Sequence, residues 1–142
     1  MQRLVKILLV EDDLLDQMEV KRTLDRKNIL YRMKIAHNGE EAVKMLNDTS
    51  YDEVFRGKPD IILVDLNMPK MNGFEFLNML KANDDWKDIK VFMLTTSDEQ
   101  EDKLAAQNIG ISGFITKPLK LESPSSLDAF NLMIDLMNMQ IK

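Results

Sequence analysis

Five side chains with complementary charges and hydrogen-bonding groups stand at the ends of short apolar runs in this sequence. Glu11 and Asp12 follow the first run, and Asp65 closes the third. Thr95 closes the fourth run, and Lys117 follows the last residue of the fifth. In open parallel sheets, ligands bind at the carboxyl ends of the strands. If the first and third strands are neighbours, we therefore expect these groups to share one cleft.

The three carboxylates predict a magnesium site. Three like charges in one cleft are unfavourable unless a cation joins them or some of them are protonated. The chain has no cysteine, and oxygen-only ligands suit a hard cation, Mg²⁺ above others. We expect His37, the single histidine, to be a surface residue. Mg²⁺ and Lys117 together balance the three negative charges, so the site could accept a dianionic phosphoryl group.

The elements that must position these groups are five apolar, β-branched-rich runs that alternate with stretches of helical spacing. The runs cover residues 4–10, 31–36, 60–65, 89–95 and 112–116. Apolar residues recur at helical intervals between them, beginning with Leu14, Leu15, Met18 and Leu24. Nearly unbroken apolar runs are typical of strands that are covered on both faces. The pattern predicts a doubly wound α/β fold, in which residues 47–59 either extend the second helix or form a loop.

Size and charge limit the function further. The chain has 142 residues, enough for one buried core, and we expect a single domain over 1–142 with no output domain. Its net charge of −5 argues against non-specific nucleic-acid binding. No apolar run approaches the roughly 20 residues that a membrane span needs, and no signal peptide is evident, so we expect a cytoplasmic protein.

Several motifs resemble those of the receiver domains of two-component response regulators. They are Ile7-Leu8-Leu9-Val10-Glu11-Asp12-Asp13, Ile62-Leu63-Val64-Asp65-Leu66-Asn67-Met68-Pro69, Met71-Asn72-Gly73, Leu94-Thr95-Thr96-Ser97 and Gly113-Phe114-Ile115-Thr116-Lys117-Pro118. Within this family, the Thr95-Thr96-Ser97 and Phe114-Ile115-Thr116-Lys117-Pro118-Leu119 motifs, with the long connection before the third strand, resemble the cyanobacterial phytochrome response-regulator group. The resemblance implies a flavodoxin-like, five-stranded parallel sheet in the order 2-1-3-4-5 with five helices.

The resemblance also implies a role for each residue. Asp65 would accept a phosphoryl group from a phosphohistidine of a sensor histidine kinase, of the phytochrome type if the subgroup holds. Mg²⁺ would be bound by the side chains of Glu11, Asp12 and Asp65 and by the main-chain carbonyl of Asn67. The remaining roles are a phosphoryl contact for Lys117, a switching pair of Thr95 and Phe114, and control of the lifetime of the phosphoryl group by Asn67 and Ser97. The domain would assist its own phosphorylation and dephosphorylation without being an enzyme.

Two alternatives concern the site itself. The acidic run has a third member, Asp13, which would enter the metal site if the motif were aligned one residue later; we prefer the alignment in which Val10 directly precedes the metal-binding pair. A haloacid-dehalogenase-type phosphatase also uses an aspartate nucleophile at a strand end. It needs a second aspartate two residues on, where this chain has Asn67.

The output is expected to be an interaction made by an apolar helix near the C-terminus. One of its faces consists of Leu127, Phe130, Ile134, Met137 and Ile141. A second apolar face would need a neighbour, which predicts a homodimer or a kinase-docking surface formed with the adjoining strand. The competing interpretations are a helix that its own domain buries more fully, and a receiver-fold scaffold that works without phosphorylation.

Overall fold

Five strands and four helices alternate along the part of the chain that the computed structural model describes. That part comprises residues 4–26, 30–48, 57–66, 73–96 and 100–117, without the side chains of residues 96, 100–103, 116 and 117. The strands are β1 (Val5–Val10), β2 (Tyr31–Ala36), β3 (Ile61–Asp65), β4 (Lys90–Thr96) and β5 (Gly113–Lys117). The helices are α1 (Leu14–Arg26), α2 (Gly39–Asn47), α3 (Gly73–Ala82) and α4 (Gln100–Ile109). Each predicted run matches its strand to within one residue at either end.

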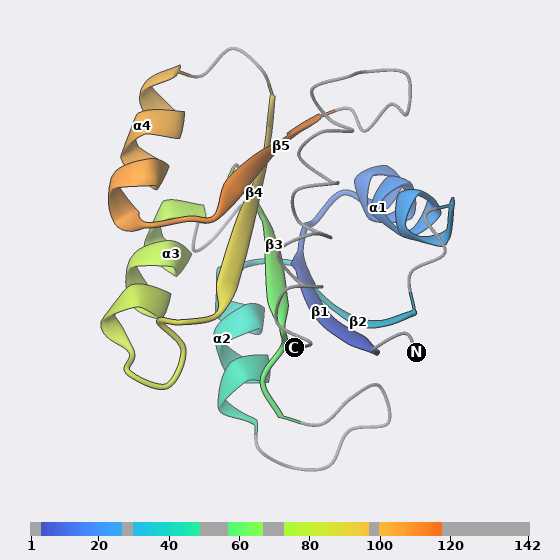
Figure 1. Cartoon of the computed structure of the whole chain (residues 1–142), viewed down its shortest axis with the longest axis horizontal. Coiled ribbons are helices and arrows are strands. Elements are labelled where there is room, and N and C mark those ends of the chain that lie inside the picture. Colours follow the sequence, from blue (N-terminus) through green and yellow to red (C-terminus); the bar gives the residue numbers. More distant parts are fainter. Residues whose placement is uncertain (1–3, 27–29, 49–56, 67–72, 97–99, 118–142) are drawn as a thin grey trace.

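The strands form one parallel sheet in the order β2-β1-β3-β4-β5 (Figure 1). This confirms the predicted doubly wound topology. The predicted fifth helix falls in residues 118–142, outside the described residues, as does most of the connection 47–59. Helix α2 ends at Asn47, and the extended backbone of Asp48 follows it, so the connection does not continue this helix.

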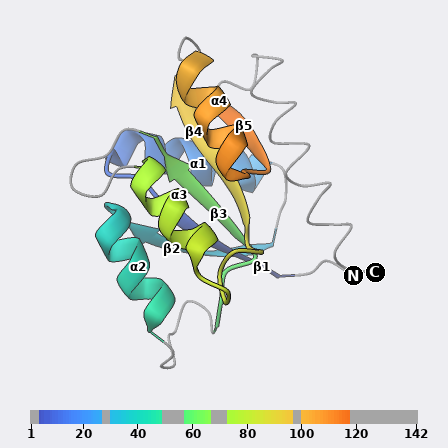
Figure 2. The same cartoon turned by 90° about the vertical axis from the view of Figure 1, so that its left-hand side faces the viewer.

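Alternating side chains of the strands belong to two separate apolar clusters, one on each face of the sheet. One cluster contains Leu8, Val10, Ile62, Val64, Val91 and Met93 of the sheet with residues of α2, α3 and α4. The other contains Ile7, Leu9, Ile61, Leu63, Phe92, Leu94 and Ile115 with Val20 and Leu24 of α1. Successive strand residues point to opposite faces, so both faces are buried. Accordingly, α1 lies on one side of the sheet, while the other three described helices lie on the opposite side (Figure 2).

Helix α1 confirms the predicted helical spacing but buries different residues from those that made the pattern visible. Its buried residues are Gln17, Val20, Thr23 and Leu24. The apolar residues Leu14 and Leu15 are 68% and 72% exposed, and Met18 is 47% exposed. A glutamine and a threonine thus occupy the face that packs on the sheet, and two leucines project from the first turn.

The helical connections change sides of the sheet between β1 and β3. The helix that follows β1 lies on one face, and the helix that follows β3 lies on the other. In such sheets, the carboxyl ends of the strands at this reversal are the usual position for a ligand. None of the helices within the described ranges is both long enough and apolar enough to span a bilayer.

Candidate functional site

Glu11 and Asp12 occupy the turn that leaves β1, and only the first of them is enclosed. The main-chain N–H of Glu11 donates to the Ala36 carbonyl at 2.9 Å, which extends the β1–β2 pairing by one residue. The Glu11 side chain is fully buried, and its Oε2 accepts the Asp13 N–H at 3.2 Å. Asp12 is exposed. The turn therefore presents one buried and one solvent-facing carboxylate.

Asp65 closes β3 beside this turn. Val10 pairs with Val64 across the two strands, so Asp65 and Glu11 are the next residues on neighbouring strands. Asp65 is 6% exposed and pairs with Leu94 of β4 on its other side. Carboxylate oxygens of Glu11, Asp12 and Asp65 all lie within 4.8 Å of one another. The structure thus brings together the three carboxylates that the sequence analysis selected.

Asp13 caps the first turn of α1. Its Oδ1 accepts the main-chain N–H groups of Leu15 at 2.8 Å and Asp16 at 3.2 Å. Both groups belong to the first turn of α1, where N–H groups have no partner within the helix. The side chain of Asp13 is therefore used by the helix, whereas carboxylate oxygens of Glu11 and Asp12 lie close to Asp65 in the acidic cluster.

The remaining predicted residues are placed to different degrees. Thr95 is 2% exposed near the end of β4 and follows Leu94, the partner of Asp65. Lys117 is the last residue of β5 and pairs with Thr96, but its side chain lies outside the described part. Phe114 is half-buried, pairs with Met93 and packs on the cluster beneath α3 and α4. Asn67, Ser97 and the apolar C-terminal segment lie outside the described residues.

The donor set fits a hard divalent cation. Each of the three carboxylates offers an oxygen, and the described residues contribute no nitrogen or sulfur ligand to the cluster. Six oxygens in octahedral arrangement, several of them from water, surround Mg²⁺ in proteins. An exposed Asp12 beside two enclosed carboxylates leaves one side of the cluster open to solvent.

Gly73 lets α3 pack closely against the end of β3, next to Asp65. The sequence motif did not reveal this contact. Gly73 begins α3, and its N–H donates to the Leu66 carbonyl at 3.2 Å. A Cβ at this position would lie 2.9 Å from the Asp65 carbonyl oxygen, 3.0 Å from the Leu66 Cα and 3.1 Å from the Leu66 carbonyl oxygen. Helix α3 can approach the end of β3 this closely because position 73 lacks a side chain.

Gln17 is a second residue that the sequence analysis missed. Its side-chain Nε2 donates to the main-chain carbonyl of Glu11 at 2.8 Å, and the bond is buried. A sequence signal existed, because Gln17 stands three and seven residues before Val20 and Leu24, on the same helical face. A polar residue in such a stripe indicates a buried hydrogen bond.

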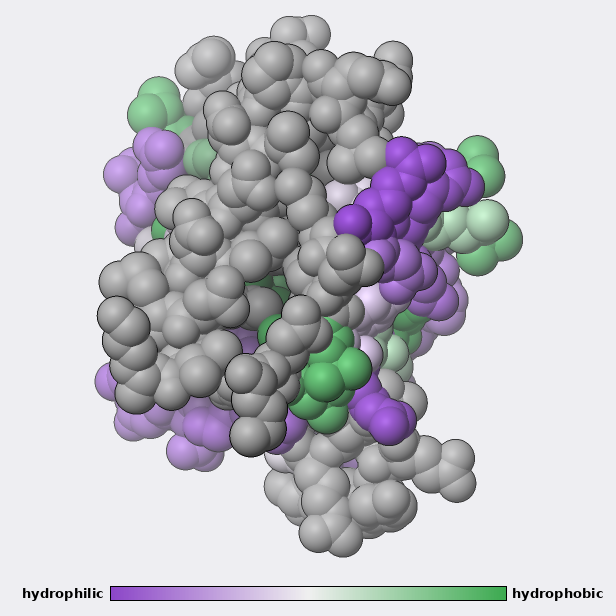
Figure 3. All heavy atoms as spheres, turned by 45° about the vertical axis from the view of Figure 1, so that its right-hand side comes forward, coloured by the Kyte–Doolittle hydropathy of each residue, from purple (hydrophilic) through white to green (hydrophobic). Residues whose placement is uncertain are grey.

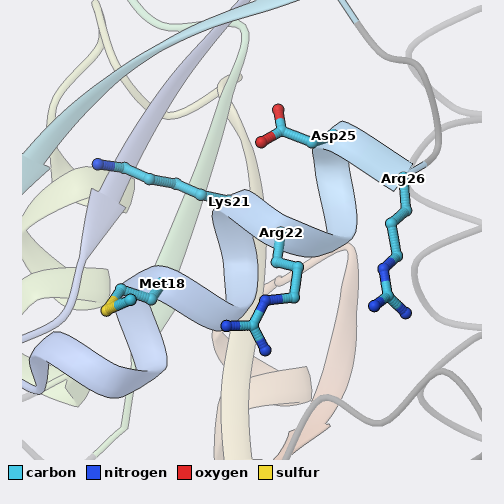
Figure 4. Close-up of a pocket in the computed structure, with 5 residues that line it drawn as sticks. All are labelled: Met18, Lys21, Arg22, Asp25 and Arg26. Atoms are coloured by element: carbon cyan, nitrogen blue, oxygen red, sulfur yellow. The ribbon is translucent and has the colours of Figure 1, made fainter.

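The outer face of α1 combines apolar and charged side chains close to the acidic turn (Figure 3). A surface pocket farther along the helix is lined by Met18, Lys21, Arg22, Asp25 and Arg26 (Figure 4). Arg22 is also paired with Glu19, 3.2 Å away. The pocket includes none of the acidic cluster, so it is a separate feature of the α1 surface.

The chain matches known proteins over most of its length. Residues 7–124 match the family model of the response regulator receiver domain. Response regulator Rcp1 from Synechocystis sp. is 35% identical over 116 residues, which are 82% of this chain and 78% of Rcp1. Response regulator MprA from Mycobacterium ulcerans is 29% identical over 118 residues, and the match spans 46% of its length.

Solved structures give the same result. The bacteriophytochrome response regulator RtBRR has a TM-score of 0.77 and 30% identity, covering 92% of this chain and 78% of that one. The Mn²⁺-bound form of Rcp1 has a TM-score of 0.72 and 33% identity, covering 93% of this chain and 91% of that one. The fold, the acidic cluster and these matches agree: the chain belongs to the response regulator receiver domain family of two-component signalling and is similar to phytochrome response regulators.

Proposed function

We propose that this domain accepts a phosphoryl group from a sensor histidine kinase onto Asp65, in a reaction that requires Mg²⁺. The observation that carries the proposal is the meeting of three carboxylates within 4.8 Å at the carboxyl edge of the sheet. Glu11, Asp12 and Asp65, with the main-chain carbonyl of Asn67, are the proposed ligands. Support also comes from the Mn²⁺-bound form of the similar protein Rcp1.

Asp65 is the proposed nucleophile. One of its carboxylate oxygens attacks phosphorus, the bond from phosphorus to the donor histidine nitrogen breaks, and an aspartyl phosphate forms. When bound by these ligands, Mg²⁺ would supply positive charge that stabilises the transfer. Phosphoryl transfer needs mainly positioning and charge stabilisation. In this proposal Asp65 is held on a buried strand end, and Lys117 at the end of β5 contributes the second positive charge.

Thr95 and Phe114 are the proposed switch. Thr95 is buried on β4, and Phe114 on β5 is only half-buried against the core. A hydroxyl that moves to a new phosphoryl oxygen vacates space, and the aromatic ring can then turn inward. The populations of two arrangements of the β4–β5 surface would shift. Asn67 and Ser97 are proposed to set the lifetime of the acyl phosphate, so the domain would assist its own reactions without turning over a free substrate.

The phosphoryl donor must approach the open side of the carboxylate cluster. The first two turns of α1 follow the acidic turn directly and expose Leu14, Leu15 and Met18. Exposed apolar side chains grouped beside a reactive site are typical of docking surfaces. We assign this surface to the histidine-bearing domain of the kinase, and the similarity to phytochrome response regulators favours a phytochrome-type kinase.

The location and the output of the domain both belong to the proposed function. We propose a cytoplasmic domain whose output is association, either with itself through the C-terminal apolar segment and the adjoining strand or with a target protein. Light scattering with and without beryllofluoride, which mimics the phosphoryl group, tests this part. An unchanged mass would contradict a phosphorylation-dependent homodimer.

The acceptor is tested by incubation with acetyl phosphate and Mg²⁺, followed by intact mass spectrometry. Asp65→Asn should abolish the phosphoryl adduct. Asp88→Asn is the matched control, since Asp88 is an exposed aspartate in the connection between α3 and β4, and it should leave labelling unchanged. A labelled Asp65→Asn protein would place the acceptor elsewhere. A wild-type protein that is never labelled would favour the phosphorylation-independent scaffold.

A further inference from the structure

Gln17 links the first helix to the main chain of the metal-binding turn. The side chain is 6% exposed, and its Nε2 donates to the Glu11 carbonyl oxygen at 2.8 Å. The residues join elements on either side of the turn, because Glu11 follows β1 and Gln17 lies in the first half of α1. The hydrogen bond therefore closes the turn that presents Glu11 and Asp12.

An amide is an unexpected group at this position of α1. Val20 and Leu24, on the same face, are fully buried in the cluster beneath the helix. An apolar side chain of similar size would pack there without the cost of burying a polar group. The Nε2 donor of the amide has its partner in the Glu11 main-chain carbonyl, so its distinctive contribution is made at the metal-binding turn.

Two further hydrogen bonds complete a closed ring with this one. The Asp13 N–H donates to Oε2 of Glu11 at 3.2 Å, and the Gln17 N–H donates to the Asp13 carbonyl at 3.0 Å. The Gln17 side chain then returns to the Glu11 carbonyl. Such a ring resists changes in the backbone angles of every residue within it. This matters because the turn holds two carboxylates beside Asp65, and their mutual repulsion pushes it open.

We propose that Gln17 is a positioning residue for the Mg²⁺ site, holding the turn in the conformation that brings the carboxylates of Glu11 and Asp12 next to Asp65. This inference rests on the proposed function, because it assumes that these carboxylates bind Mg²⁺. Groups that hydrogen-bond to a metal ligand typically change metal affinity by about 10–100-fold when they are removed, and Gln17 bonds to the main chain of one proposed ligand residue.

The test compares two variants of Gln17 with a matched control on the same helix. Gln17→Met keeps the size of the side chain and removes the donor, whereas Gln17→Asn keeps the amide but shortens its reach. Thr23→Val is the control, because the buried Thr23 hydroxyl also donates to a main-chain carbonyl, that of Glu19 at 2.8 Å, without touching the turn. Mg²⁺ affinity is measured by titration calorimetry, and amide hydrogen exchange is measured in the metal-free protein.

Both Gln17 variants should weaken Mg²⁺ binding by about tenfold or more. They should also accelerate exchange of the main-chain amides at positions 13 and 17 in the metal-free protein, and Thr23→Val should do neither. Wild-type affinity and wild-type exchange in Gln17→Met would overturn the inference and leave packing as the role of Gln17. If the wild-type protein itself does not bind Mg²⁺, the proposed function fails and the inference fails with it. Loss of Mg²⁺ binding in the Gln17 variants alone supports the inference, and it leaves the proposed acceptor and the family assignment unchanged.

Discussion

Replacing Gly73 by alanine should damage the site without changing any group that takes part in the chemistry. The three atoms nearest to the added methyl group would be main-chain atoms of Asp65 and Leu66 at the end of β3, the nearest being the Asp65 carbonyl oxygen at 2.9 Å. Ordinary contact begins at 3.4 Å, so the start of α3 and the end of β3 must separate by about 0.5 Å. Main-chain atoms of a buried strand cannot turn aside as a flexible side chain would.

The expected cost is that of overpacking a tight interior, about 1–3 kcal/mol of unfolding free energy. Equilibrium unfolding in guanidinium chloride can be followed by the fluorescence of Trp86, the single tryptophan, which belongs to the same core cluster as Phe76 and Leu77 of α3. A displacement of about 1 Å at a reacting group can cost about 100-fold in rate. We expect labelling of Asp65 by acetyl phosphate to slow by about tenfold, in keeping with the smaller shift.

Gly57→Ala provides the control, because it separates backbone strain from crowding. Gly57 has a φ of +76°, and a Cβ there would meet nothing within 4 Å. The change should cost about 1–2 kcal/mol through backbone strain alone and leave the rate of labelling unchanged. A Gly73→Ala protein with wild-type stability and wild-type labelling would refute the argument from close contact.

Three further predictions concern other parts of the domain. Asn38 caps α2, because its Oδ1 accepts the Glu41 N–H at 2.9 Å. Asn38→Ala should therefore lower the unfolding free energy by about 1 kcal/mol in the same denaturation assay. An unchanged free energy would show that the cap contributes nothing. The pKa of Tyr31 is raised, first by burial and then by the hydrogen bond to Asp25 and the charge of Asp25. The stability that Tyr31 contributes is therefore complete below pH about 10 and is lost as the pH rises through the raised pKa. The difference in tyrosinate absorbance between the wild type and Tyr31→Phe, followed against pH, measures the pKa of Tyr31. Titration of Tyr31 at or below its ordinary pKa would contradict the prediction. Asp12→Asn should stabilise the metal-free protein, because it removes one of three like charges. With Mg²⁺ at 100 times its Kd, however, the variant should lose most of the roughly 2.7 kcal/mol by which the ion stabilises the wild type. Thermal unfolding with and without Mg²⁺ measures both effects, and an unchanged response to Mg²⁺ would remove Asp12 from the ligand set.

Much of the fold could be predicted because its strands are covered on both faces. Such strands need nearly continuous apolar residues, and β3, for example, follows the predicted run almost residue for residue. The candidate site followed from the same pattern, since Asp65 interrupts the apolar run where the strand must end. The carboxyl ends of parallel strands share one edge, so strand order alone was enough to bring Glu11 and Asp65 together.

Other features depended on contacts between residues whose relation the sequence does not display. Sequence spacing alone left the role of Asp13 open, and only its two hydrogen bonds to the first turn of α1 identify it as a cap. The apolar pattern of α1 drew attention to Leu14 and Leu15, whereas packing buried Gln17 instead. The approach of α3 to β3 at Gly73 is likewise a property of two packed elements. Apolar periodicity and strand ends thus determined the architecture and the acidic cluster, because they depend on local pattern. The support of the acidic turn was decided by tertiary packing, which sets the residues that face the sheet and the main-chain groups within reach of a buried amide.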